Sequence, residues 1–524
     1  MTDLRIVAAM SRPDFYPHRP SSVEVVQTHI SYVFIAGELV YKVKKAVDFG
    51  FLDFTTLEKR RENCLKEVNL NRRLAPDTYL GVAEIGEGEN GEIVLGAGRT
   101  VEYAVKMKKL PMDRMLVELL AKGQIKPPDM RRVADRLVSF HGRAESGPEI
   151  DRFGSLEVIR RNHDENFEQT KGFIGRTISR EQYEFIKSYV DEFLSGRRAL
   201  LQKRVSGRHI RDCHGDLHAE HICFTDGIVI FDCIEFNDRF RYSDTIADVA
   251  FLAMDLDFRG YPAHARAFFD AYTRLSGDHD DSELLPLYMC YYAYVRGKVI
   301  GFRLDDPAIS APEKEAARST AARYFELAAK YAASPEKPLL IITTGLMGSG
   351  KSVLAANLSA LLGAEVIRTD VLRKQILNIR PEERRLEKFG KGIYSDDVTA
   401  RTYEKAFELA LEVIAGGRTA IIDASFKKNT DRLRAARIAQ AAGTGFFVVE
   451  CICGDQTVRK RLEGRLRANR DASDGRWELY QQQKEDFDPV SGMPPQSHIT
   501  VDTCGSQVSS LYEAISRIRF RKST

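Results

Sequence analysis

The stretch Gly-Leu-Met-Gly-Ser-Gly-Lys-Ser at 345–352 has the residue types of a loop that binds phosphate. It fits G-x-x-x-x-G-K-[ST] at every fixed position. Glycines let successive backbone N–H groups turn toward one anion, and the N-terminus of a following helix adds partial positive charge. Lys351 can then reach the outer phosphates of a nucleotide, and the Ser352 hydroxyl can ligate magnesium. We therefore expect the remaining phosphate contacts to come from Gly345, Gly348, Ser349 and Gly350.

Two acids follow apolar stretches in the same half of the chain. Asp370 comes after Val366–Thr369, and Asp423 comes after Thr419–Ile422. In an open parallel sheet ligands bind beyond the carboxyl ends of the strands, so both acids are placed beside the phosphate loop. Asp370 is read either as the base that accepts the proton of a substrate hydroxyl or as a helix N-cap. Asp423 is expected to assist the magnesium ion.

A second concentration of polar chemistry lies upstream, in Cys-His-Gly-Asp-Leu-His-Ala-Glu-His at 213–221 and Ile-Phe-Asp-Cys at 230–233. Asp216 and Asp232 bracket a short hairpin there. This arrangement suits phosphoryl transfer, with one carboxylate accepting a hydroxyl proton and the other holding magnesium. The residues alone also permit a metal site, since three histidines are close together, or a plain polar turn. Those histidines are His214, His218 and His221.

Composition fits a soluble protein of several domains. The chain has 524 residues, 29% of them charged, and a net charge of +3. Because the charge is nearly balanced, composition gives no argument for a nucleic-acid or membrane partner. The eight cysteines are scattered without a C-x-x-C pair, which argues against a zinc site or a disulfide framework. Without a recognisable signal peptide or membrane span, we expect a cytoplasmic location.

The elements needed to position these groups follow from periodicity. Strands are predicted in 23–35 and at Leu39–Lys44, with Lys42 and Lys44 on one strand face, and a helix over Leu57–Leu74. Helices then dominate to about residue 332, interrupted by the hairpin block. From residue 339 strands and helices alternate, which predicts a parallel sheet with flanking helices. The predicted domains are 1–333 and 339–524, joined by the linker 334–338.

The motif His-Gly-Asp-Leu-His at 214–218 resembles the catalytic loop of aminoglycoside phosphotransferase-like kinases, relatives of the protein kinases. The resemblance implies a bilobal α+β domain in which Asp216 is the catalytic base and Asp232 a magnesium ligand. It implies that Lys42, or else Lys44, binds the nucleotide phosphates and that Glu67 is the ion-pair partner of that lysine. It also implies that Asp248 supports the catalytic loop. Taken alone, the two lysines read as a solvated strand face and Glu67 as a surface helix residue.

One position departs from that family. The family has asparagine as a second metal ligand five residues after the catalytic aspartate, where this chain has His221. A neutral imidazole is a poor magnesium ligand compared with an oxygen donor. Another group could supply the oxygen, the site could prefer a different metal, or the kinase could be weakened.

The second half resembles small P-loop kinases of the gluconate kinase, zeta-toxin and polynucleotide 5′-kinase group, with an α/β fold. The resemblance implies Asp370 as base and Arg373 as a substrate contact. The basic stretch 459–467 is read either as a solvated helix or as a lid that brings Arg461 or Arg465 to the transferred phosphate. The whole chain resembles bacterial bifunctional proteins that fuse these two domains.

The leading hypothesis is a tandem kinase that uses ATP and Mg²⁺ to phosphorylate a hydroxyl of a sugar- or nucleoside-like small molecule. A second hypothesis makes the first domain a non-catalytic nucleotide or ligand sensor that regulates the P-loop domain. A third is a kinase of nucleic-acid 5′ ends, which would need a basic groove and stacking aromatics. A true antibiotic-resistance kinase is a weaker reading.

Overall fold

The computed structural model describes residues 4–50, 52–278, 281–380, 383, 387–468 and 474–520. Its tertiary contacts form two compact units. The first comprises Met1–Gly172 and Asp191–Tyr324, and the second comprises Phe173–Val190 and Phe325–Thr524. The division falls inside helices α7 (Arg180–Gly196) and α13 (Ala311–Ala333). The domain boundary expected at 334–338 stays a prediction, because compact units need not follow domain boundaries along the chain.

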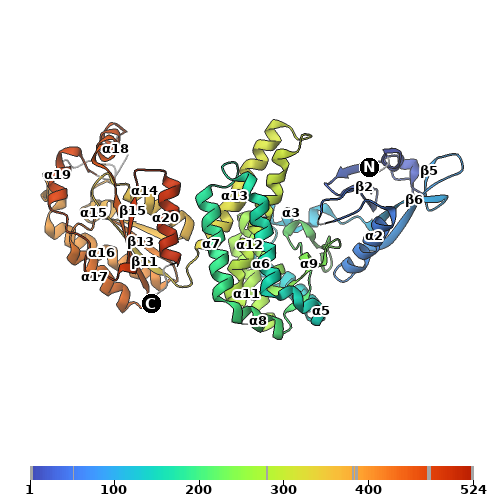
Figure 1. Ribbon diagram of the computed structural model, residues 1–524, viewed down its shortest axis with the longest axis horizontal. Coiled ribbons are helices and arrows are strands. Elements are labelled where there is room, and N and C mark those ends of the chain that lie inside the picture. Colours follow the sequence, from blue (N-terminus) through green and yellow to red (C-terminus); the bar gives the residue numbers. More distant parts are fainter. Residues whose placement is uncertain are drawn as a thin grey trace. The chain divides into compact units, whose positions relative to one another are not determined.

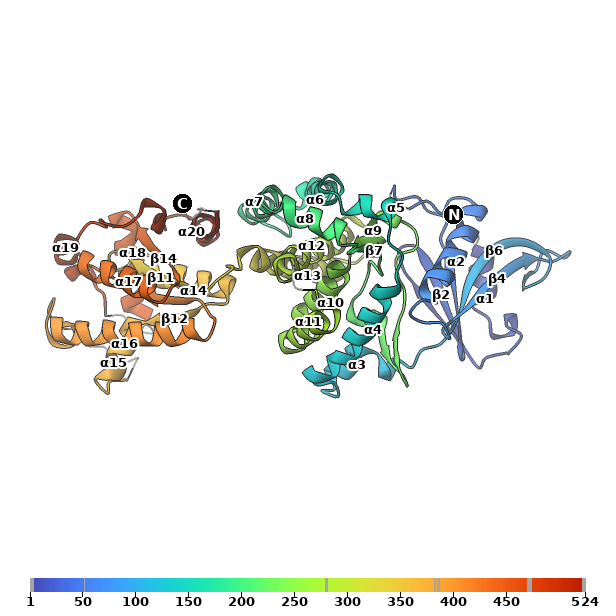
Figure 2. The same ribbon diagram turned by 90° about the horizontal axis from the view of Figure 1, so that it is seen from below.

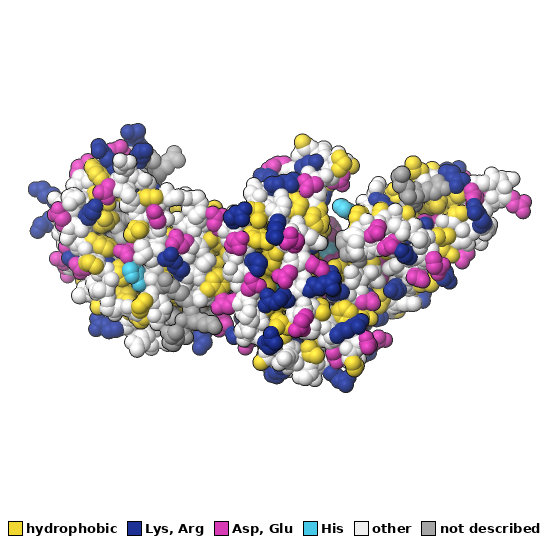
Figure 3. All heavy atoms as spheres, viewed as in Figure 1, with side chains coloured by type: hydrophobic (Ala, Val, Ile, Leu, Met, Phe, Trp, Pro, Cys, Tyr) yellow, Lys and Arg dark blue, Asp and Glu magenta, His cyan; other side chains and the backbone are white. Residues whose placement is uncertain are grey.

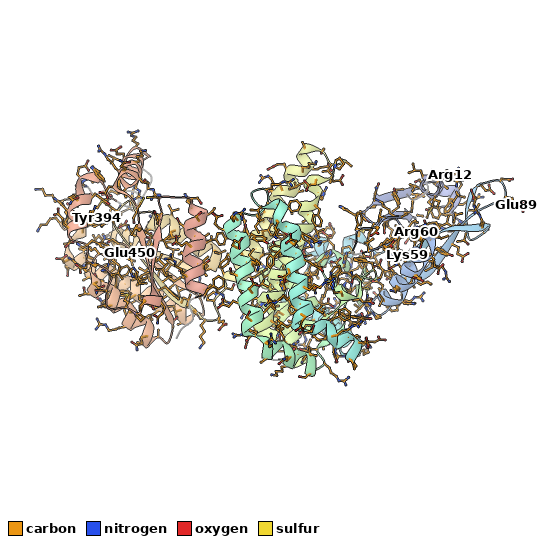
Figure 4. The ribbon with its side chains drawn as sticks, in the orientation of Figure 1. Arg12, Lys59, Arg60, Glu89, Tyr394 and Glu450 are labelled. Carbon is orange, nitrogen blue, oxygen red and sulfur yellow. The ribbon has the colours of Figure 1, made fainter. Side chains whose placement is uncertain are left out.

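The first lobe of unit 1 is an antiparallel sheet with strand order β1-β2-β3-β6-β4-β5. Its strands β2, β5 and β6 are labelled in Figure 1. Helix α2 (Leu57–Asn71) packs on this sheet through Cys64 and Val68, which contact Val105 of β6. Arg60 of α2, labelled in Figure 4, is buried and its Nε donates to Glu102 of β6 at 2.9 Å. The strands are β1 (Val23–Gln27), β2 (Ser31–Ala36), β3 (Leu39–Lys44), β4 (Tyr79–Glu87), β5 (Ile93–Leu95) and β6 (Arg99–Lys108).

The second lobe of unit 1 is helical, and two short ribbons carry its polar motif. Strand β7 (Ile210–Asp212) pairs with β10 (Tyr242–Asp244), and β8 (Ile222–Phe224) pairs with β9 (Ile228–Ile230), both antiparallel. Helix α10 is buried along almost its whole length, and its mostly apolar sequence includes two buried aspartates, Asp248 and Asp255. The main helices are α3 (Leu116–Ala121), α4 (Met130–Arg143), α6 (Leu156–Thr170), α8 (Arg198–Ser206), α10 (Thr245–Phe258), α11 (Pro262–Ser276) and α12 (Asp281–Phe302).

Unit 2 contains a parallel sheet with strand order β12-β13-β11-β14-β15. Leu340 and Ile342 of β11 join one core with α16 and α17, and the alternation of a strand turns Ile341 to the other face. Helices therefore cover both faces of the sheet, as Figures 1 and 2 show. The strands are β11 (Leu339–Thr344), β12 (Glu365–Arg368), β13 (Ala420–Asp423), β14 (Gly445–Ile452) and β15 (His498–Asp502). The helices are α14 (Lys351–Leu362), α15 (Thr369–Ile376), α16 (Asp396–Ala415), α17 (Asn429–Ala441), α18 (Asp455–Ala468), α19 (Trp477–Glu485) and α20 (Gln507–Phe520).

The predicted fold class is confirmed: a bilobal, kinase-like α+β domain precedes an α/β P-loop domain with a parallel sheet. Several details differ. Leu65, within the predicted helix Leu57–Leu74, is 40% exposed although it is apolar, while Glu67 is fully buried. Strand β15 was not predicted, because its apolar stretch is short and polar residues flank it on both sides. Strand β14 ends at Ile452, which leaves Cys453 half-buried.

Charged side chains of both signs are interspersed over the visible face of each unit (Figure 3). This agrees with the nearly balanced composition. No helix within the described residues combines the length and apolarity needed to cross a membrane.

Candidate nucleotide sites

The first candidate site is built around lysines of β3 and a glutamate of α2. Lys42 Nζ lies 2.9 Å from Glu67 Oε1 and 2.6 Å from Asp232 Oδ1. Two residues along the same strand face, Lys44 Nζ lies 2.7 Å from Glu67 Oε2 and also contacts Glu235. One buried glutamate therefore joins both lysines. The reading of these lysines as a solvated strand face, and of Glu67 as a surface residue, is wrong.

The charges in this cluster stabilise one another. Burial would lower the pKa of Lys42, but Asp232 and Glu67 outweigh it and raise the pKa well above its usual value. Burial alone would raise the pKa of Asp232, but the neighbouring Lys42 and His221 outweigh it. The pKa of Asp232 is therefore below its usual value. The backbone φ of Asp232 is 61°, a left-handed conformation that aspartate tolerates better than most residues. Asp232 comes two residues after the end of β9 and contacts Lys42 of β3.

The loop that carries Asp216 is held by a buried carboxylate. Asp248 accepts the backbone N–H groups of His214 at 2.7 Å and Gly215 at 2.8 Å. The Asp248 carboxylate is itself oriented by His141 Nε2 at 3.2 Å. Burial raises the pKa of Asp216, although His221 opposes the shift, and a raised pKa makes a carboxylate a better proton acceptor. The expected contact of Asp248 with the catalytic loop is present.

His221 lies between the two presumed functional acids. Its Nδ1 contacts the Asp216 carbonyl at 2.9 Å, and its Nε2 lies 3.6 Å from Asp232 Oδ2. Magnesium prefers oxygen ligands, so the carboxylate oxygen of this pair suits it and the imidazole nitrogen does not. Asp232 therefore fits the magnesium role, and His221 does not.

The second candidate site is the phosphate loop between β11 and α14. Gly345, Gly348 and Gly350 have φ of 132°, 75° and 90°, and a Cβ at Gly345 would lie 2.4 Å from the carbonyl oxygen of Cys451. These values explain why the loop needs glycine. Lys351 begins α14, and its Nζ donates to the Leu346 carbonyl at 2.8 Å, so the side chain folds back over its own loop.

Acids meet this loop at the edge of the sheet. The Ser352 hydroxyl donates to Asp423, a hydrogen bond that works against the rise in the Asp423 pKa caused by burial. A hydroxyl and a carboxylate side by side are oxygen donors that suit magnesium. Burial lowers the pKa of Lys351, while Asp423 and Asp370 oppose the shift. Because both acids act on this lysine, Lys351, Asp370 and Asp423 form one electrostatic cluster.

One cleft contains these groups together with the presumed substrate contact. It is lined by Lys351, Ser352, Asp370, Arg373 and Asp423, among others. Asp370 is the second residue of α15, not its N-cap, so the N-cap reading is wrong. Arg373 is buried, donates to the Ile393 carbonyl and Thr399, and lies over the ring of Tyr394 with 4.9 Å to its centroid. Tyr394 is labelled in Figure 4.

The two lid candidates on α18 differ in position. Arg465 lines the cleft. Arg461 instead binds the back of the phosphate loop, donating to the Thr503 carbonyl at 2.5 Å and the Gly348 carbonyl at 3.4 Å. Thr503 in turn donates to the Ser349 carbonyl at 2.5 Å. Arg461 therefore supports the loop from behind, and of the two only Arg465 lines the cleft.

Sequence reasoning missed several residues of both sites. Glu235 follows Asp232 by three residues, and its burial against Lys44 could have been suspected only from the long apolar run around it. Thr503 and the pair Tyr394–Asp474, whose side chains bond at 2.9 Å, come from segments without a motif.

Comparison with known proteins agrees with this architecture. The model of the phosphotransferase enzyme family matches residues 112–285, and the model of an AAA domain matches residues 340–490. The two domains and their sites define a two-domain kinase, an aminoglycoside phosphotransferase-like domain fused to a P-loop kinase domain. The chain belongs to the family of uncharacterized proteins from Mycobacterium tuberculosis and Mycobacterium bovis. It is 30% identical to each over 452 residues, which cover 86% of this chain and 88% of theirs.

Solved structures align with about a third of the chain. A gluconokinase from Sinorhizobium meliloti is 19% identical, with 35% of this chain and 93% of that chain covered and a TM-score of 0.26. An APS kinase from Mycobacterium tuberculosis is 21% identical, with 35% and 99% covered and a TM-score of 0.26.

Proposed function

We propose that this kinase has two nucleotide sites and transfers the γ-phosphate of ATP to a hydroxyl group of a sugar- or nucleoside-like small molecule. The observation that carries the proposal is one cleft of unit 2, which brings Lys351, Ser352, Asp370 and Asp423 together. A phosphate loop alone indicates a nucleotide, and a carboxylate facing it adds a base for an acceptor hydroxyl.

Each group in this cleft has a distinct role in the proposal. Lys351 binds the outer phosphates, and Asp370 accepts the proton of the acceptor hydroxyl as its oxygen attacks phosphorus. Arg373 holds the acceptor, and Arg465 neutralises charge on the transferred phosphoryl group. Ser352 and Asp423 would hold magnesium, which when bound shields the phosphate charge.

In unit 1 the corresponding roles fall to Lys42 for the phosphates, Glu67 for positioning that lysine, and Asp216 as base. The Lys42–Glu67 contact of 2.9 Å supports this assignment, because the ion pair fixes the lysine beside Asp232. The acceptor of this site belongs to the same chemical class in the proposal.

A nucleic-acid partner is less favoured, since the aromatic rings of the cleft are already engaged. Lys427 lies over Phe389 and Arg373 over Tyr394, with 5.0 and 4.9 Å to the ring centroids. Tyr403 stacks on Phe426 at 4.7 Å. Base stacking on these rings would have to compete with those contacts.

A second candidate function keeps unit 1 as a nucleotide-binding regulator without turnover. It is favoured by one observation: His221 occupies the place of an oxygen ligand beside Asp232. In that case Asp216→Asn in the full chain should leave total phosphoryl transfer unchanged. Loss of a transfer activity in that variant would exclude the regulator.

The test of the proposal uses γ-labelled ATP and a panel of hydroxyl acceptors with the full chain. Lys351→Ala is expected to lower transfer by the P-loop site by at least about 100-fold, because phosphate charge loses its fixed cation. Lys405→Ala, an exposed lysine of α16 paired with Glu408, is the matched control and should keep full transfer. Unchanged transfer in Lys351→Ala would refute the P-loop part of the proposal. Transfer of the label from ATP to a 5′-hydroxyl oligonucleotide would instead support the alternative of a kinase of nucleic-acid 5′ ends.

A further inference from the structure

The orientation of His221 distinguishes its two ring nitrogens. Nδ1 lies 2.9 Å from the Asp216 carbonyl oxygen, which can only accept a hydrogen bond. Nδ1 is therefore the donor of this hydrogen bond, and Nε2, on the other side of the ring, lies 3.6 Å from Asp232 Oδ2. Histidines that ligate metals commonly donate their second N–H to a backbone carbonyl in this manner.

The gap between His221 Nε2 and Asp232 Oδ2 suits a cation. At 3.6 Å it exceeds the length of an N–H···O hydrogen bond. A dication about 2.1 Å from both atoms would make an angle of ~118° between them, within about 10° of the tetrahedral value. The other oxygen of Asp232, Oδ1, already accepts from Lys42 at 2.6 Å, so Oδ2 is the oxygen left for a metal.

The donor types decide which metal fits. Imidazole nitrogen suits zinc, cobalt and similar transition metals, whereas magnesium prefers oxygen ligands and keeps its water. We propose that the nucleotide site of unit 1 binds a transition-metal dication through His221 Nε2 and Asp232 Oδ2, in preference to magnesium. The inference rests on the proposed function, because phosphate oxygens of the nucleotide would replace the water that completes the coordination in the free protein.

The test titrates Co²⁺ into the full chain without nucleotide and records visible absorption. The wild type is expected to bind one equivalent with intense d–d bands, which Zn²⁺ abolishes and a large excess of Mg²⁺ does not. His221→Asn and Asp232→Asn should lose the bands and weaken Co²⁺ binding at least tenfold. His264→Asn is the control; this helical-lobe histidine bonds to the Ile125 carbonyl at 3.0 Å and should keep them.

Equal spectra in the wild type and His221→Asn, or displacement of Co²⁺ by Mg²⁺ at comparable concentrations, would overturn the inference. The readout is independent of phosphoryl transfer. If the Co²⁺ bands appear but unit 1 transfers no phosphate, the metal site is supported. In that case unit 1 takes no part in the proposed catalysis. Bands lost in His218→Asn but kept in Asp232→Asn would also overturn it, since His218 forms a different cluster with Asp216 and His221.

A separate observation concerns two cysteines of unit 2. Cys453 follows β14 and Cys504 lies just after β15, and these strands pair so that Ile452 is opposite Asp502. Their Sγ atoms are 2.6 Å apart. All eight cysteines are free thiols; Cys504 is exposed, Cys453 is half-buried and the other six are buried.

Closeness and exposure, rather than acidity, favour reaction of this pair. The Gly454 N–H donates to Cys504 Sγ at 3.1 Å, and the Arg461 guanidinium lies 3.7 Å from Cys453 Sγ. Burial and the contact with Cys504 raise the pKa of the Cys453 thiol, although Arg461 opposes the shift, and the exposed Cys504 is open to an oxidant from solvent.

The geometry points to a redox modification site in which a peroxide converts Cys453 and Cys504 into a disulfide. One thiolate attacks a peroxide oxygen and becomes a sulfenic acid as the O–O bond breaks. The second thiol attacks that sulfur and displaces the hydroxyl group. Two thiols and one hydrogen peroxide thus give one disulfide and two waters. The pair is next to Thr503 and Arg461, which hold the phosphate loop.

Peptide mapping of the full chain after hydrogen peroxide treatment tests this site. We expect a linked peptide that contains Cys453 and Cys504, two protons lighter than the sum of its parts and split by dithiothreitol. Cys504→Ser should leave Cys453 open to alkylation in the same treatment. The expectation of no disulfide from cysteine spacing would then be wrong for this pair. Peroxide-treated wild type in which both cysteines still alkylate, or form only sulfinic acids, would overturn the proposal.

Discussion

Asp370→Asn is expected to lower phosphoryl transfer by the P-loop site about 100- to 10,000-fold, the usual contribution of a general base. The amide keeps the shape of the side chain but cannot accept the acceptor proton. ATP affinity should change by no more than about twofold, because the base proposed here meets the acceptor hydroxyl in the transition state and acts on Lys351 of the phosphate loop only through its charge. Steady-state transfer and ATP binding, measured on one preparation, separate the two quantities.

The matched control is Asp397→Asn, an exposed aspartate in the first turn of α16 that should retain full transfer. Asp423→Asn provides a contrast, since Asp423 accepts from Ser352 and is placed to hold the metal. That variant should weaken nucleotide binding and transfer together. If Asp370→Asn lost ATP binding and transfer in equal proportion, Asp370 would be a nucleotide ligand and the role of base would be wrong.

Local sequence determines most of the P-loop site, which is why sequence reasoning placed it well. Gly345–Ser352 specify the loop by backbone conformation, and a strand that ends in an acid brings Asp423 to the same edge. In a parallel sheet the residues at the carboxyl ends of the strands meet at one edge. The position of Asp423 could therefore be predicted without the rest of the fold. The sequence could not show that Arg461 lies behind the phosphate loop and not in the lid. Helical periodicity shows which residues share a face, but it does not show which element that face contacts.

The site of unit 1 depends on contacts far apart in sequence. Lys42 and Asp232 are separated by 190 residues, and only the family resemblance linked them before the structure was available. Periodicity could not show that Glu67 is buried, because a charged residue on a helix is usually exposed. Its burial becomes favourable only when two lysines from β3 face it.

Lys44 has a structural role that the sequence did not indicate. In the sequence analysis it was only the alternative to Lys42 as the phosphate-binding lysine. Its side chain is fully buried between Glu67 and Glu235. Burial would lower the pKa of Lys44, but these carboxylates raise it above its usual value, so the ammonium stays charged in the interior. Lys44 therefore neutralises two buried acids that Lys42 alone cannot satisfy.

Lys44→Met, which keeps the side-chain volume but removes the charge, is expected to destabilise unit 1 by about 3–5 kcal/mol, as breaking a buried ion pair does. In a unit of this size that loss corresponds to a fall in the melting temperature of roughly 10 °C. Circular dichroism at helical wavelengths follows both units. Fluorescence of Trp477, the single tryptophan of the chain, follows unit 2 alone.

We expect the dichroism of Lys44→Met to show an earlier transition while the fluorescence transition stays in place. Lys108→Met is the control, since Lys108 is exposed at the end of β6 in the same sheet and should unfold as the wild type does. A Lys44→Met protein as stable as this control would mean that Glu67 and Glu235 are protonated in the folded state. The buried cluster would then be held by neutral hydrogen bonds, and Lys42 alone would carry the charge of the site.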